Sequence, residues 1–146
     1  MGLDNLEGKS LEKISPDAVT IRRLLEAASR SLHDAQLPDM SPESRFDLAY
    51  KAIMQTANAA LQANGYRTLT SKPGHHQTMI QTLPQTIGLE PATMVVLDAL
   101  RKQRNVIDYS GDQVSESMAT EAIQHAANLV QRIEQWLANH QPGLLP

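Results

Sequence analysis

The chain has 146 residues and a formal net charge of −3, and 41% of its residues are hydrophobic whereas only 3% are aromatic. This length suits one domain with a single core, and the weak negative charge argues against electrostatic or sequence-specific binding of duplex DNA. Because the sequence has no cysteine, disulfides, thiolate nucleophiles and cysteine-based zinc sites are excluded.

The first 14 residues predict an N-terminal arm. They are polar, contain two glycines, and space Leu3, Leu6 and Leu11 so that one side can rest on the body of the protein. They lack the basic region and apolar core of a secretion signal. No apolar run in the chain approaches the roughly 20 residues of a membrane span. We therefore expect a cytoplasmic protein that makes no membrane contact.

Two long helices are predicted next, and each follows a serine-proline pair. Ser15-Pro16 provides a hydroxyl N-cap and a proline at the first helical position, and Ser41-Pro42 repeats the signal. Apolar residues then recur at steps of three and four, as in Ile21, Leu25 and Ala28. Asn64-Gly65 is typical of a helix C-terminus, and a loop is expected over residues 66–74. Because the turn between these helices is short, they should be antiparallel neighbours.

The second half predicts one short and two long helices. The short helix runs from about His75 to Leu83 and is halted by Pro84. A long helix opens at Glu90-Pro91 and runs to about Tyr109, and the last extends from about Ser115 to Ala138. No strand is expected. The fold class is thus all-α, an up-and-down bundle of four long helices plus one short helix over residues 15–139, with a flexible tail over 140–146.

A polar stripe late in the third long helix is the most informative feature. Residues three, four and seven apart share a helix face, so Arg101, Arg104, Asn105 and Asp108 line up beside an apolar seam. Burying such groups costs desolvation energy, which a purely structural helix has little reason to incur. Arg104 and Asp108 can form an i,i+4 pair where a phosphate or a partner docks, with Arg101 nearer the outer edge. The alternative is a solvated helix face with an ordinary ion pair.

The sequence gives little support for a metal site. His75 and His76 are adjacent and therefore point about 100° apart on a helix, and none of the five histidines has metal-ligand spacing. We expect no metal and no cofactor. His75 or His76 is expected at the helix start or at a bundle contact, with the alternative that one of them reaches the polar stripe. Tyr109 closes the helix beside Asp108, and its hydroxyl needs a hydrogen-bond partner.

These elements and motifs together resemble the HEPN superfamily (higher eukaryotes and prokaryotes nucleotide-binding), over about residues 3–138. The most specific part is the Arg-Asn pair within Arg101-x-x-Arg104-Asn105-x-x-Asp108-Tyr109. The remaining support lies in Asn5-Leu6, Ser41 to Tyr50, Asn64-Gly65-Tyr66-Arg67 and Gly74-His75-His76. The resemblance implies an up-and-down helical bundle, which agrees with the count of helices from periodicity.

In HEPN members that cleave RNA, the arginine is followed several residues later by a histidine. Residues from two subunits then form a metal-independent ribonuclease site at the dimer interface. Here no histidine occurs between Arg104 and His125, and the segment resembles members regarded as non-nucleolytic or of unknown activity. An unperturbed Asp108 is also a weak base near pH 7. The resemblance further implies a homodimer and a nucleotidyltransferase-type protein partner of a toxin–antitoxin pair.

The leading hypothesis is a catalytically inactive homodimer that binds a nucleotide, RNA or a partner protein. Its ligand-binding residues would be Arg101, Arg104, Asn105, Asp108 and Tyr109. The first alternative is a metal-independent ribonuclease in which His75 or His76 joins Arg104 and Asp108 as catalytic candidates. The second is a structural adaptor whose polar stripe forms a dimer seam. A ribonuclease predicts Arg104 exposed in a cleft near a histidine, whereas an adaptor predicts Arg104 and Asp108 buried in mutual hydrogen bonds.

Overall fold

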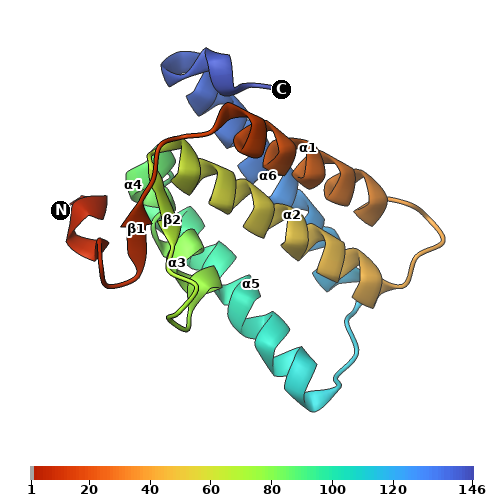
Figure 1. Ribbon diagram of the computed structural model, residues 1–146. Coiled ribbons are helices and arrows are strands. Elements are labelled where there is room, and N and C mark those ends of the chain that lie inside the picture. The colour runs from red at the N-terminus through yellow and green to blue at the C-terminus, as the bar shows by residue number, and fades with distance from the viewer. Residues whose placement is uncertain (1) are drawn as a thin grey trace.

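The computed structural model describes residues 2–146, so Met1 of the predicted arm lies outside it. Within this range four long helices form: α1 (Ala18–Ala35), α2 (Pro42–Ala63), α5 (Pro91–Ser110) and α6 (Glu116–His140). Two short helices, α3 (His75–Gln81) and α4 (Leu83–Ile87), lie between α2 and α5 (Figure 1). The predicted all-α helical bundle is confirmed.

Helix α2 is the central helix, with α1 and α6 beside it (Figure 1). Many of its buried positions are small, because alanine side chains let the neighbouring helices approach closely. Phe46, Ile53 and Leu61 fill the larger spaces and are at most 1% exposed. The buried alanines of α2 are Ala49, Ala52, Ala57, Ala59, Ala60 and Ala63.

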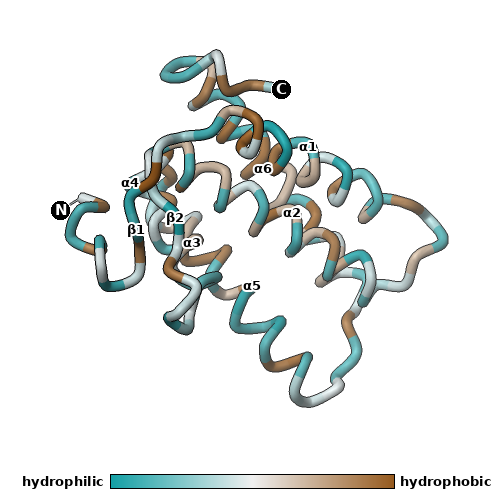
Figure 2. The backbone as a smooth tube through the Cα atoms, in the orientation of Figure 1, coloured by the Kyte–Doolittle hydropathy of each residue, from teal (hydrophilic) through white to brown (hydrophobic). Residues whose placement is uncertain are grey.

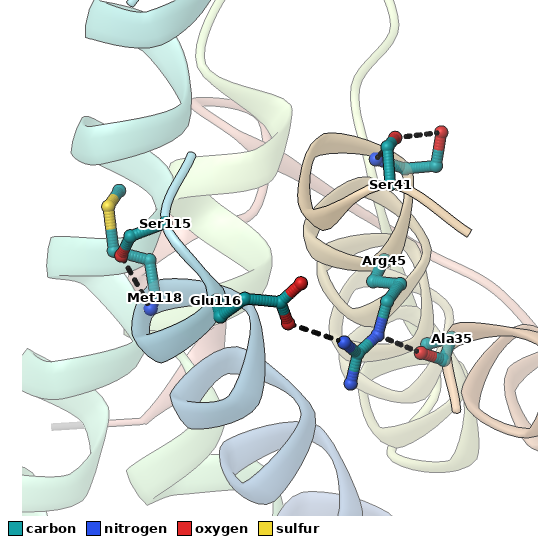
Figure 3. Close-up of polar contacts among 7 residues, drawn as sticks. Ala35, Ser41, Arg45, Ser115, Glu116 and Met118 are labelled. Atoms are coloured by element: carbon teal, nitrogen blue, oxygen red, sulfur yellow. Dashed lines mark hydrogen bonds and ion pairs between the residues drawn. The ribbon is translucent and has the colours of Figure 1, made fainter. Parts of the chain in front are cut away.

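Serine side chains cap two of the long helices, as Figure 3 shows. Ser41 Oγ accepts a hydrogen bond from the Ser44 backbone N–H at 3.2 Å, and Ser115 Oγ accepts one from Met118 at 3.1 Å. Each cap satisfies a backbone donor that the first turn leaves without a partner. The helix starts predicted at Pro42 and near Ser115 are therefore confirmed.

Arg45 joins three helices near these caps (Figure 3). Its Nε donates to the Ala35 carbonyl at 3.0 Å, and its terminal nitrogen lies 2.8 Å from Glu116 Oε2. The Ala35 carbonyl lies in the last turn of α1, where no backbone N–H of the same helix is available to donate to it. This one side chain therefore fixes the end of α1 and the start of α6 against α2.

The first helix begins later than the sequence predicted. Helix α1 starts at Ala18 instead of Pro16, and Asp17 takes the N-cap position in place of Ser15. The Asp17 carboxylate accepts from the Val19 N–H at 3.3 Å and from the Thr20 hydroxyl. A carboxylate is favoured at the positive end of the helix dipole, so it competes successfully with the serine two residues earlier.

The predicted stop at Pro84 is wrong. Helix α3 already ends at Gln81, and Pro84 lies in the first turn of a further helix, α4. A proline is tolerated there because the first turn does not use its N–H groups. The real stop is Gly88, whose left-handed φ of 69° ends α4.

A small antiparallel sheet corrects the expectation that no strand forms. Strand β1 (Leu11–Lys13) pairs with β2 (Tyr66–Thr68), with Leu11 opposite Thr68 and Lys13 opposite Tyr66. Three residues are too few to produce a readable alternation of polar and apolar side chains. The arm, which starts with the 3₁₀ helix η1 (Leu3–Leu6), nevertheless rests on the body as predicted, because Leu11 is fully buried.

The C-terminal segment expected as a tail makes contacts of its own. Helix α6 ends at His140, and Pro142–Leu144 form the 3₁₀ helix η2. Arg22 of α1 donates to the Leu145 carbonyl at 3.1 Å and also to the Gly143 carbonyl. The last residues are therefore held against α1 by backbone acceptors that a sequence pattern does not reveal.

Helix α5 is the least enclosed of the long helices. Leu97 and Leu100 in its N-terminal half are buried, whereas Val106 and Tyr109 in its C-terminal half are 60% and 93% exposed. Its C-terminal end extends beyond the other helices in Figure 1, and hydrophilic and hydrophobic positions alternate along it in Figure 2. No helix of residues 2–146 combines the length and the apolar character needed to cross a membrane.

Candidate functional site: a groove beside Arg104

Arg101 and Arg104 lie one turn apart on α5 but have different surroundings. Arg101 Nε lies 2.8 Å from Asp98 Oδ1, and the two side chains are only 14% and 11% exposed. The hydrogen bond from Arg101 lowers the pKa of Asp98, against the opposing effect of burial. Gln81 of α3 also donates to Asp98, at 3.4 Å. Arg101 is thus a buried partner of Asp98 and not, as the sequence suggested, an outer-edge residue.

The predicted ion pair between Arg104 and Asp108 does not form. Arg104 turns to α2, where its Nε lies 3.7 Å from Asp47 Oδ1 and its Cζ lies 4.8 Å from the centre of the Tyr50 ring. Asp108 is exposed on the last turn of α5, where water competes for its carboxylate. The Arg104 Nε itself is buried and has no hydrogen-bond partner within residues 2–146. The hydrogen bonds between Arg104 and Asp108 that the adaptor alternative predicted are therefore missing.

His76 lies on the same side of the molecule, at the start of α3. Its Nδ1 is 3.0 Å from Tyr50 Oη, and the two rings are tilted at a centroid distance of 5.7 Å. Burial lowers the pKa of His76, and the neighbouring cations, Arg104 first among them, lower it further. Burial also raises the pKa of Tyr50. Near neutral pH both groups are therefore uncharged, and the guanidinium of Arg104 is the charge beside them.

These side chains line a groove with a volume of about 400 Å³, which we call the Arg104 groove. Helix α2 forms its floor, and α1, α3 and α5 each add one or two side chains. Its volume lies within the range of small-molecule sites in proteins. The lining residues are Leu24, Asp47, Leu48, Tyr50, Lys51, Met54, Gln55, Asn58, His76, Met79 and Arg104.

The lining divides into a polar part and an apolar part. Cationic and amide groups come from Arg104, Lys51, Gln55 and Asn58, and Asp47 supplies a carboxylate that is 62% exposed. The apolar part consists of leucine and methionine side chains, and the flexible methionines adapt to the shape of a ligand. A ligand that carries both an anionic group and an apolar face matches these two kinds of lining group.

The residues proposed from the sequence separate into two groups. Arg104 and His76 line the groove together. The ribonuclease alternative predicted such a histidine near Arg104. Asn105, Asp108 and Tyr109 are exposed at the end of α5 and do not line it. His75 has a buried Nε2 with no hydrogen-bond partner in the described part of the chain, and it too is absent from the lining.

Four groove residues on α2 were missed although the sequence contains their signal. Asp47, Lys51, Gln55 and Asn58 recur at steps of four, four and three, so they form one polar stripe on that helix. Tyr50 was expected in the core, and it is indeed only 3% exposed while its ring faces Arg104. The groove could have been predicted by pairing this polar stripe on α2 with the polar stripe on α5 that contains Arg104.

The charged side chains of residues 2–146 do not gather as metal ligands would. No three His, Asp or Glu side chains lie close enough to hold one ion in this range. The hydrogen-bond donors of the Arg104 groove suit an anion instead.

Comparison of the chain with protein-family models, with curated proteins and with solved structures gives no match.

Proposed function

We propose that the protein binds a nucleotide, or one nucleotide unit of single-stranded RNA, in the Arg104 groove. The observation that carries this proposal is the buried Arg104 Nε, which has no hydrogen-bond partner among the described residues. The Arg104 side chain is 33% exposed in the groove, so an acceptor bound to the exposed part of its guanidinium would compensate the charge that the protein leaves incompletely hydrogen-bonded. Phosphate oxygens are such acceptors, because guanidinium groups bind them through charge-assisted hydrogen bonds.

The rest of the groove supports a nucleotide over a bare phosphate. Lys51 adds a second cation one turn from Asp47, and Leu24, Leu48 and Met79 offer an apolar wall for a base. The resemblance of the Arg104-Asn105 segment to the HEPN superfamily implies the same class of ligand. In this proposal Arg104 holds the phosphate, and Tyr50 supports the guanidinium from its ring face at 4.8 Å.

Arginine variants test this proposal with a matched control. The affinity for GMP and for a fluorescent single-stranded RNA is measured by calorimetry and by anisotropy. Arg104→Gln should weaken binding of both by about tenfold or more, since a charge-assisted hydrogen bond contributes about 1.5–3 kcal/mol. Arg132→Gln is the control, because its side chain is similarly exposed, at 34% against 33%, and lies outside the groove. Equal affinities for both variants would exclude Arg104 as the phosphate ligand.

A second candidate function is RNA cleavage, and the proximity of His76 to Arg104 favours it. A neutral His76 would take the proton of a 2′-hydroxyl, whose oxygen attacks the adjacent phosphorus while the 5′-oxygen of the next nucleotide leaves and takes up a proton from water. Arg104 would stabilise the charge on the phosphate. We favour binding without cleavage, because His76 is the one histidine that lines the groove and its Nδ1 is already bonded to Tyr50.

Incubation of the pure protein with single-stranded RNA in excess chelator separates the two functions. The binding proposal predicts intact RNA. Chelator-resistant cleavage that disappears in both His76→Ala and Arg104→Ala would establish the ribonuclease instead. Cleavage that survives in both variants would indicate a contaminating nuclease and leave binding as the function to measure.

We further propose that the protein forms a two-fold dimer through α5. Val95 and Val106 are each 60% exposed, and Tyr109 is 93% exposed. Val106 and Tyr109 follow Val95 by 11 and 14 residues. Both separations are close to whole numbers of helical turns, so the three side chains share one face of α5. Light scattering at tens of micromolar should give twice the chain mass, and Val106→Glu should give a monomer. A wild-type monomer at that concentration would contradict the dimer.

A further inference from the structure

The two amide side chains of the Arg104 groove are held in defined orientations. Gln55 Oε1 accepts a hydrogen bond from Ser31 Oγ at 3.0 Å, and Ser31 is only 6% exposed. Asn58 Oδ1 accepts one from Gln62 Nε2 at 3.1 Å. In both cases a donor of the protein already binds the carbonyl oxygen and thereby fixes which way the amide faces. The NH₂ groups of Gln55 and Asn58 are therefore the parts that remain for a ligand.

These orientations make the interior of the groove rich in donors. An amide NH₂ has two N–H donors and no acceptor, and the side chains of Lys51 and Arg104 also only donate. Among the charged lining residues, the acceptor is Asp47, which lies beside Arg104 and is largely exposed. A ligand edge placed at Gln55 and Asn58 must therefore offer acceptors.

The spacing of the two amides suits a pair of neighbouring acceptors. Gln55 and Asn58 are three residues apart on α2, so they project from adjacent positions on one face, about 5–6 Å apart at their Cβ atoms. The O6 and N7 atoms of a 6-oxopurine are two adjacent acceptors, whereas adenine presents the N7 acceptor next to an N6 amino donor. An adenine amino group would face an N–H donor and leave both without an acceptor.

We infer that the Arg104 groove selects a 6-oxopurine nucleotide, with guanine or hypoxanthine as its base, over an adenine nucleotide. This inference rests on the proposed function, because it assumes that the phosphate lies at Arg104. Gln55 and Asn58 donate to O6 and N7 of the base, and the apolar wall that includes Met79 contacts its face. Ser31 is a positioning residue, since it acts through the orientation of the Gln55 amide.

Calorimetric titrations with GMP, IMP, AMP and ribose 5-phosphate test the inference. GMP and IMP should bind about tenfold more tightly than AMP, the discrimination typical of one bidentate base contact. IMP is the matched probe, because it carries an oxygen where AMP carries the amino group. Ribose 5-phosphate reports on the phosphate contact alone. If ribose 5-phosphate and all three nucleotides bind with equal affinity, and Arg104→Gln weakens each of them, only the selection of the base is overturned. If none of the four binds, the proposed function fails as well.

Variants at two positions test the orientation of the amide. Ser31→Ala removes the hydroxyl that holds the Gln55 carbonyl, so the GMP/AMP affinity ratio should fall toward one. Ser29→Ala, on the exposed side of α1, should leave the ratio unchanged. Gln55→Glu replaces the NH₂ by an oxygen of the same size and should favour AMP over GMP. A ratio that stays near ten in both Ser31→Ala and Gln55→Glu would overturn the inference, because a purely structural role would move affinity and not the ratio.

Discussion

Replacing Arg101 should destabilise the protein far more than replacing Arg104. The Asp98 residue is 8% exposed, and its carboxylate accepts the Arg101 hydrogen bond at 2.8 Å. Removing one partner of a buried ion pair costs about 3–5 kcal/mol, because the remaining charge is left without compensation. Here Gln81 at 3.4 Å and Lys102 at 3.8 Å still contact Asp98. We therefore expect Arg101→Ala to cost about 2 kcal/mol, from that range and the two remaining contacts.

Arg104→Ala provides the comparison. Its ion pair with Asp47 is long, at 3.7 Å, and Asp47 is 62% exposed, so the loss should stay at or below about 1 kcal/mol. Circular dichroism during thermal and urea unfolding measures both variants. A cost of 2 kcal/mol corresponds to a Tm decrease of about 6 °C for a chain of this size. Equal midpoints for Arg101→Ala and Arg104→Ala would refute the assignment of Arg101 to structure and Arg104 to ligand binding.

Two further predictions concern pH and backbone conformation. Burial lowers the pKa of His76 below its ordinary value of 6.5, so the unfolded chain binds more protons than the native state just below that pH. The contribution of neutral His76 to the free energy of unfolding should therefore be fully present above pH 6.5. It should be lost as the pH drops through 6.5 toward the lowered pKa. In urea titrations at pH 7.5 and 5.5, His76→Gln should lose less stability than the wild type, and identical losses would contradict the lowered pKa of His76. Gly65 has a φ of 86°, and an added Cβ would lie 3.4 Å from the Ile14 carbonyl oxygen. Gly65→Ala should cost about 1–2 kcal/mol in the same assay. Gly143→Ala, where an added Cβ meets no atom within 4 Å, should cost little, and an equal cost would refute the reasoning.

The long helices could be predicted from the sequence because their apolar periodicity and the caps of α2 and α6 are local, whereas the start of α1 was predicted two residues too early. Ser41 and Ser115 cap their helices as expected, and the seam containing Ile21 and Leu25 is buried in the core. The short strand pair could not be predicted, because β1 gains its partner from a segment more than 50 residues later. Its stability depends on packing of Leu11 with Leu61 and Tyr66, and no local pattern records that contact.

Only part of the candidate site could be predicted from the sequence. The prediction placed Arg104 on the informative face of α5, but it paired the residue with Asp108 on the same helix. Local spacing cannot show that Arg104 instead reaches Asp47 and Tyr50, because this choice depends on how closely α5 approaches α2. His76 is the converse case, since tertiary packing brings a histidine without readable spacing into the groove.

The most direct test of the central claim is to observe the Arg104 Nε–H signal by ¹⁵N-resolved NMR during a titration with GMP. The Nε–H belongs to a side chain that lines the groove and is 33% exposed, so a phosphate bound to its guanidinium should change the Nε–H environment strongly. We predict a saturable shift of the Arg104 signal and of the side-chain amide signals of Gln55 and Asn58, while Arg132 stays constant. Unchanged signals from Arg104 at millimolar GMP, or equal shifts at Arg104 and Arg132, would contradict nucleotide binding in this groove.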